Sequence, residues 1–161
     1  MTGVTFRPAI ATDAPVLVNI YNHYVSTSTV TFDLEVWTID DMAHKIESVN
    51  ALGMPFIVAD RGGELVGYAY LSTFREKAAY DTTMENTLYL SESARGAGIG
   101  GRMLQELCRL GEAAGIREVI AVIADTPDAV PSIRLHEKAG FTPVGKMDNV
   151  GRKFGEWIGI V

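Results

Sequence analysis

The stretch ARGAGIGGRML, residues 94–104, places four glycines within six positions and then continues as an apolar repeat typical of a helix. Backbone N–H groups crowd together at a glycine-rich helix N-terminus, where the helix dipole also favours an anion. Gly96, Gly98 and Gly101 match the G-x-G-x-x-G spacing of dinucleotide-binding loops. The stretch therefore predicts either a site for an anion such as a pyrophosphate or a tight strand-to-helix turn with no ligand.

Two nucleotide-binding motifs do not fit this stretch. A dinucleotide fingerprint follows the first strand and ends with an acidic residue about twenty positions later, at the end of the next strand. Here Glu118 precedes its strand and Asp125 comes several residues too late. A P-loop needs Lys followed by Ser or Thr, where this chain has Arg102 and Met103. Dehydrogenase and nucleotide-hydrolase functions are therefore excluded.

Length and composition limit the remaining function classes. A chain of 161 residues with 47% hydrophobic and 21% charged residues predicts one domain over residues 1–161. A net charge of -6 argues against nucleic acid or an anionic membrane as a partner. The N-terminus has no leader pattern and no apolar run reaches about eighteen residues, so we expect a cytoplasmic protein. The single Cys108 excludes an internal disulfide, and we expect no metal site.

Periodicity and turn signals indicate the elements that position the glycine stretch. Thr38 and Asp41 predict a capping box, and Arg61-Gly62-Gly63 predicts a hairpin turn. The expected strands are residues 5–8, 55–60, 64–72, 85–90, 119–124, 141–147 and 153–161. The expected helices begin after Thr12–Asp13 and after Thr38, run from residue 99 to near Gly115, and span 131–139. This order predicts an α/β (α+β) fold with parallel strands around residues 86–124.

Two motifs now carry a family resemblance. Arg95-Gly96-Ala97-Gly98-Ile99-Gly100 resembles the R/Q-x-x-G-x-G/A pyrophosphate loop of the GCN5-related N-acetyltransferases, the GNAT superfamily, and residues 132–141 resemble their second motif. The resemblance covers essentially the whole chain. It implies a single-domain GNAT fold, a mixed central sheet of about seven strands with about four helices, and acetyl-CoA as cosubstrate.

A narrower resemblance concerns the phosphinothricin and methionine sulfoximine acetyltransferases, which acetylate the α-amine of glutamate- or methionine-like analogues. The similar segments are residues 22–24, 28–32, 79–81, 85–90, 135–137 and 153–157. The resemblance implies a small-molecule amine substrate of the phosphinothricin, methionine sulfoximine or methionine sulfone type. It also implies a homodimer.

The resemblance assigns two catalytic candidates. An amine must be neutral to attack a thioester, yet an α-amino group has a pKa near 8, so a nearby carboxylate that takes the proton assists the reaction. Glu85 matches the proposed base of the family. His136 stands where many members of the superfamily carry a tyrosine as general acid. His136 either protonates the departing thiolate or only hydrogen-bonds the cofactor and its own helix.

The cofactor contacts follow from the same resemblance. The backbone of Leu88, Tyr89 and Leu90 is expected to pair with the pantetheine arm and to supply an amide for the developing oxyanion. The expected pyrophosphate site consists of Arg95, Gly96, Ala97, Gly98, Ile99, Gly100 and Gly101, with Ser132 from the second motif. The chain departs from the family at Ala129, where a cofactor-binding asparagine is usual. Asp125, Thr126 or Asp128 could replace that contact.

The substrate contacts are expected on two sides of Glu85. Arg75, Lys77 and Tyr80 lie in the segment that matches the substrate loop of the family, and Asn86 and Thr87 are expected opposite them. Phe32 and Trp37 would wall the pocket, pack in a dimer interface or belong to the core. The resulting prediction is direct acetyl transfer in a ternary complex. Acetylation of peptide or protein N-termini, or of another small amine, and a non-catalytic acyl-CoA-binding module are the alternatives.

Overall fold

The chain forms seven strands in two sheets and four α-helices in the computed structural model, which describes residues 3–161. Residues 1 and 2 of the predicted domain lie outside this range. The strands are β1 (Val4–Pro8), β2 (Phe56–Arg61), β3 (Glu64–Thr73), β4 (Thr83–Leu90), β5 (Glu118–Ile120), β6 (Met147–Lys153) and β7 (Glu156–Ile160). The helices are α1 (Ala14–Thr27), α2 (Ile39–Ala51), α3 (Ile99–Ala113) and α4 (Val130–Lys138).

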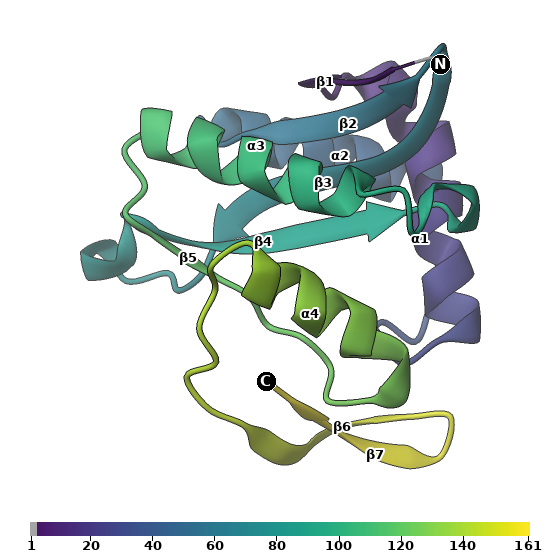
Figure 1. Cartoon of the computed structure of the whole chain (residues 1–161), viewed down its shortest axis with the longest axis vertical. Coiled ribbons are helices and arrows are strands. Elements are labelled where there is room, and N and C mark those ends of the chain that lie inside the picture. Colours follow the sequence, from purple (N-terminus) through teal and green to yellow (C-terminus); the bar gives the residue numbers. More distant parts are fainter. Residues whose placement is uncertain (1–2) are drawn as a thin grey trace.

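The larger sheet has the order β1-β2-β3-β4-β5 and is covered on both faces (Figure 1). Its strands are antiparallel except for the parallel pair β4–β5, which confirms the predicted parallel unit. Side chains alternate along β2: Phe56 and Val58 pack with α1 and α2, whereas Ile57 and Ala59 pack with α3. A strand buried on both faces is apolar at consecutive positions, as β2 is.

Local sequence signals account for the starts of the two N-terminal helices. Thr38 caps α2, since its Oγ1 accepts from the amide of Asp41 at 3.1 Å while the Asp41 carboxylate accepts from the amide of Thr38 at 2.7 Å. The capping-box prediction is confirmed. Asp13 immediately precedes α1, as predicted, but its carboxylate binds no amide of that helix. It accepts instead from the amide of Ile10 and from both terminal nitrogens of Arg7, at 2.8–2.9 Å.

The expected boundaries of the last strands were wrong. Residues 141–146 form no strand, and the expected strand 153–161 begins only at Glu156 because a two-residue turn at Phe154 and Gly155 precedes it. These two residues have φ values of 52° and 81°, so the chain reverses there and β6 pairs with β7 as a separate hairpin. The Phe-Gly pair is a weak turn signal because a bulky residue rarely adopts positive φ.

Strand β5 is also shorter than predicted. The apolar run at 119–124 reads as one buried strand, but pairing with β4 stops at Ile120. Ala124 pairs with Ile160 of β7 instead. In Figure 1 the chain after β5 runs away from β4 and towards the β6–β7 hairpin. In residues 3–161, no helix is long and apolar enough to span a membrane.

Candidate active site

The end of the parallel pairing leaves one edge of β4 free. On the β5 side, pairing of β4 ends at Glu85, which faces Ile120. On the other side, β4 pairs with β3 to the end of the strand. Within the described part of the chain, residues 86–90 therefore have no strand partner on the β5 side. An exposed strand edge offers a row of backbone donors and acceptors to an extended ligand. This edge leads from Glu85 directly to the glycine stretch.

The glycine stretch forms a loop whose amides are free at the start of α3. Gly96 and Gly98 have φ values of 76° and 74°, a left-handed conformation in which side-chain-bearing residues are strained. Among the described residues, no backbone carbonyl accepts from the amides of Gly96, Ala97 or Gly98. The first amides of α3 add further unpaired donors. The loop is therefore able to donate several hydrogen bonds to an anion at the positive end of a helix.

The two remaining glycines of the stretch differ from each other. A Cβ atom at Gly100 would lie 2.6 Å from Cδ1 of Leu135 in α4 and 3.3 Å from Cδ1 of Leu90 in β4. A Cβ atom at Gly101 would meet nothing within 4 Å. Gly100 thus permits α3 to pack closely against α4 and β4, whereas no contact requires glycine at 101. The loop is therefore a tight strand-to-helix turn, and its unpaired amides leave it able to bind an anion.

Tyr24 of α1 holds the loop in place. Its hydroxyl donates to the carbonyl of Leu90 and accepts from Nε of Arg95 at 3.3 Å. The Arg95 guanidinium lies 5.1 Å from the centre of the Tyr24 ring. Arg95 borders a hollow of about 240 Å³, which Glu92 and Asp128 also line. An exposed arginine stacked in this way presents its charge in a defined direction beside the loop.

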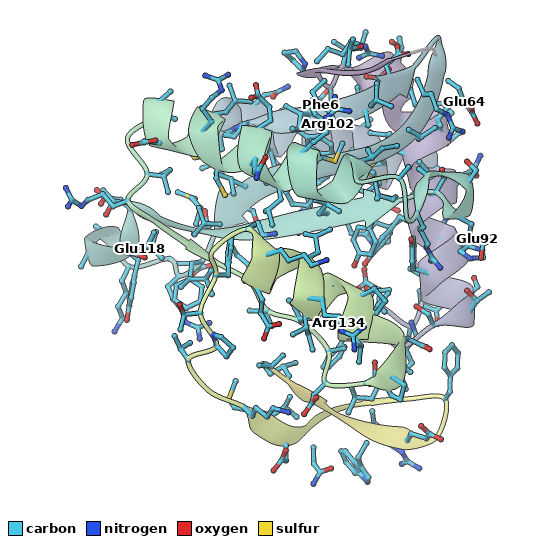
Figure 2. The ribbon with its side chains drawn as sticks, in the orientation of Figure 1. Phe6, Glu64, Glu92, Arg102, Glu118 and Arg134 are labelled. Atoms are coloured by element: carbon cyan, nitrogen blue, oxygen red, sulfur yellow. The ribbon has the colours of Figure 1, made fainter. Side chains whose placement is uncertain are left out.

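Arg102, the residue that excluded a P-loop, points to the other side of α3. Its guanidinium donates to the carbonyl of Val4 at 2.9 Å and lies 5.4 Å from the centre of the Phe6 ring. Figure 2 shows Arg102 and Phe6 next to each other, at the side of α3 that faces β1. Arg102 therefore fastens α3 to β1 and takes no part in the loop.

Glu85 and Thr87 lie on the face of β4 that is covered by α1 and α2, because side chains alternate along a strand. Tyr70 of β3 belongs to the core of that face and pairs with Thr87. Burial raises the pKa of the half-buried Glu85 carboxyl, and the positive charge of Arg75 opposes that rise. Burial also raises the pKa of Tyr70, and the negative charge of Glu85 adds to this rise.

The expected substrate loop lies between β3 and β4. Arg75 is the residue of this loop whose charge acts on Glu85. Its guanidinium lies 4.7 Å from the centre of the Phe74 ring. Tyr80 packs edge-to-face on the same Phe74 ring at 5.9 Å and remains 43% exposed. Lys77 is exposed beside them. The structure therefore brings Arg75 near Glu85, while Lys77 and Tyr80 lie further along an exposed segment.

The connection between α1 and α2 contains a polar network that sequence reasoning missed. The Tyr21 hydroxyl contacts Asp33 and lies 2.7 Å from Oγ1 of Thr31, and Nε1 of Trp37 donates to Asp33 at 2.9 Å. Lys153 of β6 is 3% exposed and donates to the carbonyl of Thr31 at 2.9 Å. Burial lowers the pKa of Lys153, and the charge of Asp33 opposes this. No local pattern links these residues, which come from three separate segments.

The two aromatic candidates of this connection have different roles. Trp37 is tied into the network and borders a groove of about 660 Å³, in which Nζ of Lys45 lies 5.9 Å from the Trp37 ring and 5.8 Å from the Tyr70 ring. Phe32 is 40% exposed and packs over Gly151 of β6, where a Cβ atom would lie 2.4 Å from the ring. Phe32 therefore joins the α1–α2 connection to the hairpin.

Asn86 and His136 meet between β4 and α4, on the opposite face of β4 from Glu85. Nδ2 of Asn86 lies 3.0 Å from Nε2 of His136, and Nδ1 of His136 lies 2.8 Å from the carbonyl of Ser132. The two side chains belong to residues that are 8% and 6% exposed. Burial lowers the pKa of His136, and the bond to Ser132 opposes this. Asn86 and Thr87, which the sequence grouped together, thus face different sides of the strand.

Ala129, where the family usually has a cofactor-binding asparagine, contributes a buried methyl group. Ala129 is fully buried at the start of α4, where it packs with Ala124 and Ile158. Of the three replacements considered, Asp125 pairs with Lys146 and Thr126 accepts from Thr29. Asp128 alone lines the hollow beside Arg95. In residues 3–161, no three His, Cys, Asp or Glu side chains are grouped as metal ligands would be.

Comparison with known proteins decides the family. The sequence profile of the acetyltransferase (GNAT) family matches residues 17–141. This chain belongs to the acetyltransferase (GNAT) family. It is 35% identical to phosphinothricin N-acetyltransferase of Alcaligenes faecalis over 98% of the chain and 79% of that protein. It is 33% identical to L-methionine sulfoximine/L-methionine sulfone acetyltransferase of Pseudomonas paraeruginosa, over 97% of the chain and 90% of that protein.

A solved GNAT structure extends the likeness to the fold. The phosphinothricin acetyltransferase (Pat) of Sinorhizobium meliloti, in complex with AcCoA, matches with a TM-score of 0.92 and 37% identity, over 99% of this chain and 85% of that one. The predicted GNAT fold is confirmed, and this GNAT protein is an acetyl-CoA-dependent N-acetyltransferase. The free edge of β4 and the unpaired amides of the glycine loop suit an extended arm that ends in a pyrophosphate.

Proposed function

We propose that this enzyme acetylates the α-amine of a small, amino-acid-like substrate of the phosphinothricin, methionine sulfoximine or methionine sulfone type, with Glu85 as general base. The observation that carries the proposal is the half-buried Glu85 carboxyl at the last residue of β4 that pairs with β5, where the free strand edge begins. The names of the relatives in Alcaligenes faecalis and Pseudomonas paraeruginosa support the substrate class.

The chemistry explains why a carboxylate is needed there. Acetyl-CoA supplies the acetyl group as a thioester. The amine nitrogen forms a bond to the acetyl carbon, the carbon–sulfur bond breaks, the proton of the amine passes to Glu85, and the sulfur leaves as a thiolate that takes a proton. Since most α-amines are protonated at neutral pH, a carboxylate beside the amine assists the reaction by taking the proton that the amine must lose.

Charged groups around Glu85 fit an anionic acceptor. Arg75 is close enough for its charge to act on Glu85, and Lys77 follows it in the same segment. We assign these cations to the carboxylate and the phosphinate- or sulfoximine-like group of the acceptor. Thr87 and Tyr70 contribute polar atoms on the same face of the strand. Within this proposal, the free edge at Leu88 to Leu90 binds the arm of the cosubstrate, and the loop with Arg95 binds its pyrophosphate.

We further propose a homodimer that forms through the β6–β7 hairpin. Four apolar side chains of this hairpin are between 48% and 64% exposed, namely Met147, Val150, Phe154 and Trp157. Several exposed apolar side chains on a two-stranded sheet are typical of a protein interface. The hairpin also contacts the α1–α2 connection through Phe32, so a dimer formed there would lie next to the connection that borders the groove at Trp37.

The function is tested by thiol release from acetyl-CoA in the presence of methionine sulfoximine, methionine sulfone, phosphinothricin, ordinary amino acids and short peptides. Saturable turnover on the first three compounds supports the proposal. Turnover confined to peptides moves the function to N-terminal acetylation. Binding of CoA without turnover on any amine indicates an acyl-CoA-binding module.

The role of the base is tested by the pH–rate profile of Glu85→Gln. We expect a loss of kcat/KM of about 10²- to 10⁴-fold near neutral pH, and a smaller loss above the amine pKa of about 8, where the amine is already neutral. Glu118→Gln is the matched control, since Glu118 carries an exposed carboxylate on β5 (Figure 2). Its backbone is opposite Thr83 in the β4–β5 pairing. A profile for Glu85→Gln that keeps both the native shape and the native magnitude would rule out this role.

A further inference from the structure

Three groups form a hydrogen-bond chain from α4 to β4. The carbonyl of Ser132 lies 2.8 Å from Nδ1 of His136, and Nε2 of His136 lies 3.0 Å from Nδ2 of Asn86. A carbonyl oxygen only accepts, so Nδ1 of His136 carries the proton of that bond. The Asn86 amide nitrogen only donates, so Nε2 of His136 carries no proton in the second bond, and burial favours this neutral ring by disfavouring its charged form. Nε2 therefore has a lone pair and accepts from the amide N–H of Asn86.

This chain determines the orientation of the Asn86 carboxamide. With Nδ2 donating to His136, the Oδ1 atom points the other way. Oδ1 is the buried side-chain polar atom in residues 3–161 that has no hydrogen-bond partner. Leaving a buried acceptor unpaired is costly, so such an atom indicates a donor that comes from a ligand or from water. Because His136 fixes the amide, that donor must be an N–H or O–H group that enters between β4 and α4.

We propose that Asn86 binds the pantetheine arm of acetyl-CoA, with its Oδ1 accepting from the N–H of the amide that lies nearest the thioester. His136 is then the positioning residue that holds Asn86 for this bond. The proposal rests on the acetyl-CoA-dependent activity described above. Asn86 is the first residue of the free edge, next to Glu85, whereas the glycine loop lies at the other end of that edge.

The position along β4 selects the amide. The arm has two amides, and its pyrophosphate end lies at the glycine loop. Asn86 is four residues from Leu90, or roughly 13 Å along an extended strand, so it meets the sulfur end of the arm. Oδ1 is covered in this structure, and the arm reaches it as the side chains between β4 and α4 separate. On this account, His136 has no proton on Nε2 with which to protonate the thiolate.

The test compares two probes by titration calorimetry. CoA contains the arm, whereas 3′-phosphoadenosine 5′-diphosphate contains the nucleotide and pyrophosphate without it. In Asn86→Leu we expect CoA to bind about tenfold more weakly and the nucleotide to bind as in the native protein. His136→Ala should weaken CoA binding in the same selective way, and the double variant should be no weaker than Asn86→Leu alone, because His136 acts through Asn86.

Asn22→Leu is the control carboxamide. Both groups of Asn22 already bond to the backbone of Trp37, at 2.8 Å each, so its loss should not separate the two probes. Equal affinities of native protein and Asn86→Leu for CoA would overturn the proposal. If the native protein bound no CoA, the assigned activity itself would fail, which is a different result.

A measurement on the native protein does not depend on the folding of any variant. The chain has three histidines, so the nitrogen NMR shifts of His136 can be assigned. A neutral ring with the proton on Nδ1 is the expected result. A proton on Nε2 would reverse the Asn86 amide and make its free group a donor, which would overturn the proposal.

Discussion

Gly98 and Gly101 provide a direct test of why the loop is rich in glycine. Each is replaced by alanine in a separate variant, and both lie at the start of α3. Gly98 has a φ of 74°, and a side chain in the left-handed conformation costs about 1–2 kcal/mol. Gly101 is helical and a Cβ atom there meets nothing within 4 Å, so alanine should stabilise the helix by about 0.5–1 kcal/mol.

The two effects have opposite signs. A domain of this size changes its Tm by about 2–4 °C per kcal/mol. We therefore expect Gly98→Ala to lower Tm by about 2–8 °C and Gly101→Ala to raise it by about 1–4 °C. Thermal unfolding followed by circular dichroism measures both. Gly98→Ala should also weaken CoA binding, because relief of the strain moves the loop amides, whereas Gly101→Ala should not.

Equal Tm values for the two variants would refute the reasoning, because the left-handed backbone of Gly98 would then have no energetic consequence. A lower Tm for Gly101→Ala would show that position 101 is crowded. Normal CoA affinity in a destabilised Gly98→Ala would separate the stability of the loop from its assignment as the pyrophosphate site.

Two further predictions concern acid stability and assembly. Arg7 lowers the pKa of the Asp13 carboxyl, so the stabilising contribution of Asp13 is present above the unfolded pKa of about 3.9 and is lost as pH falls through the lower folded value. The stability difference between the native protein and Asp13→Asn, measured by urea unfolding, should therefore shrink over that range. A stability difference that does not change with pH would contradict this prediction. Sedimentation velocity should show a native dimer and a monomeric Trp157→Glu, and a monomeric native protein would contradict the proposed assembly.

Local patterns in the sequence were enough to identify several elements of the fold. The Thr38–Asp41 box starts α2, the glycine turn at residues 61–63 joins β2 to β3, and the glycine stretch starts α3, each as predicted. Such signals depend on residues within a few positions of one another, so the chain carries them wherever it lies in space. The motif at residues 95–100 also indicated the family, which the comparisons confirmed.

Only the tertiary structure decided which residues meet. Asn86 and His136 are 50 positions apart, and Lys153 lies 122 positions from the carbonyl it binds. No periodicity predicts such contacts, because they depend on how β4, α4 and the hairpin pack. The same packing ends the pairing of β5 at Ile120 and thereby opens the edge of β4. Sequence alone indicated the chemistry of acetyl transfer, whereas packing set the faces on which Glu85 and Asn86 lie.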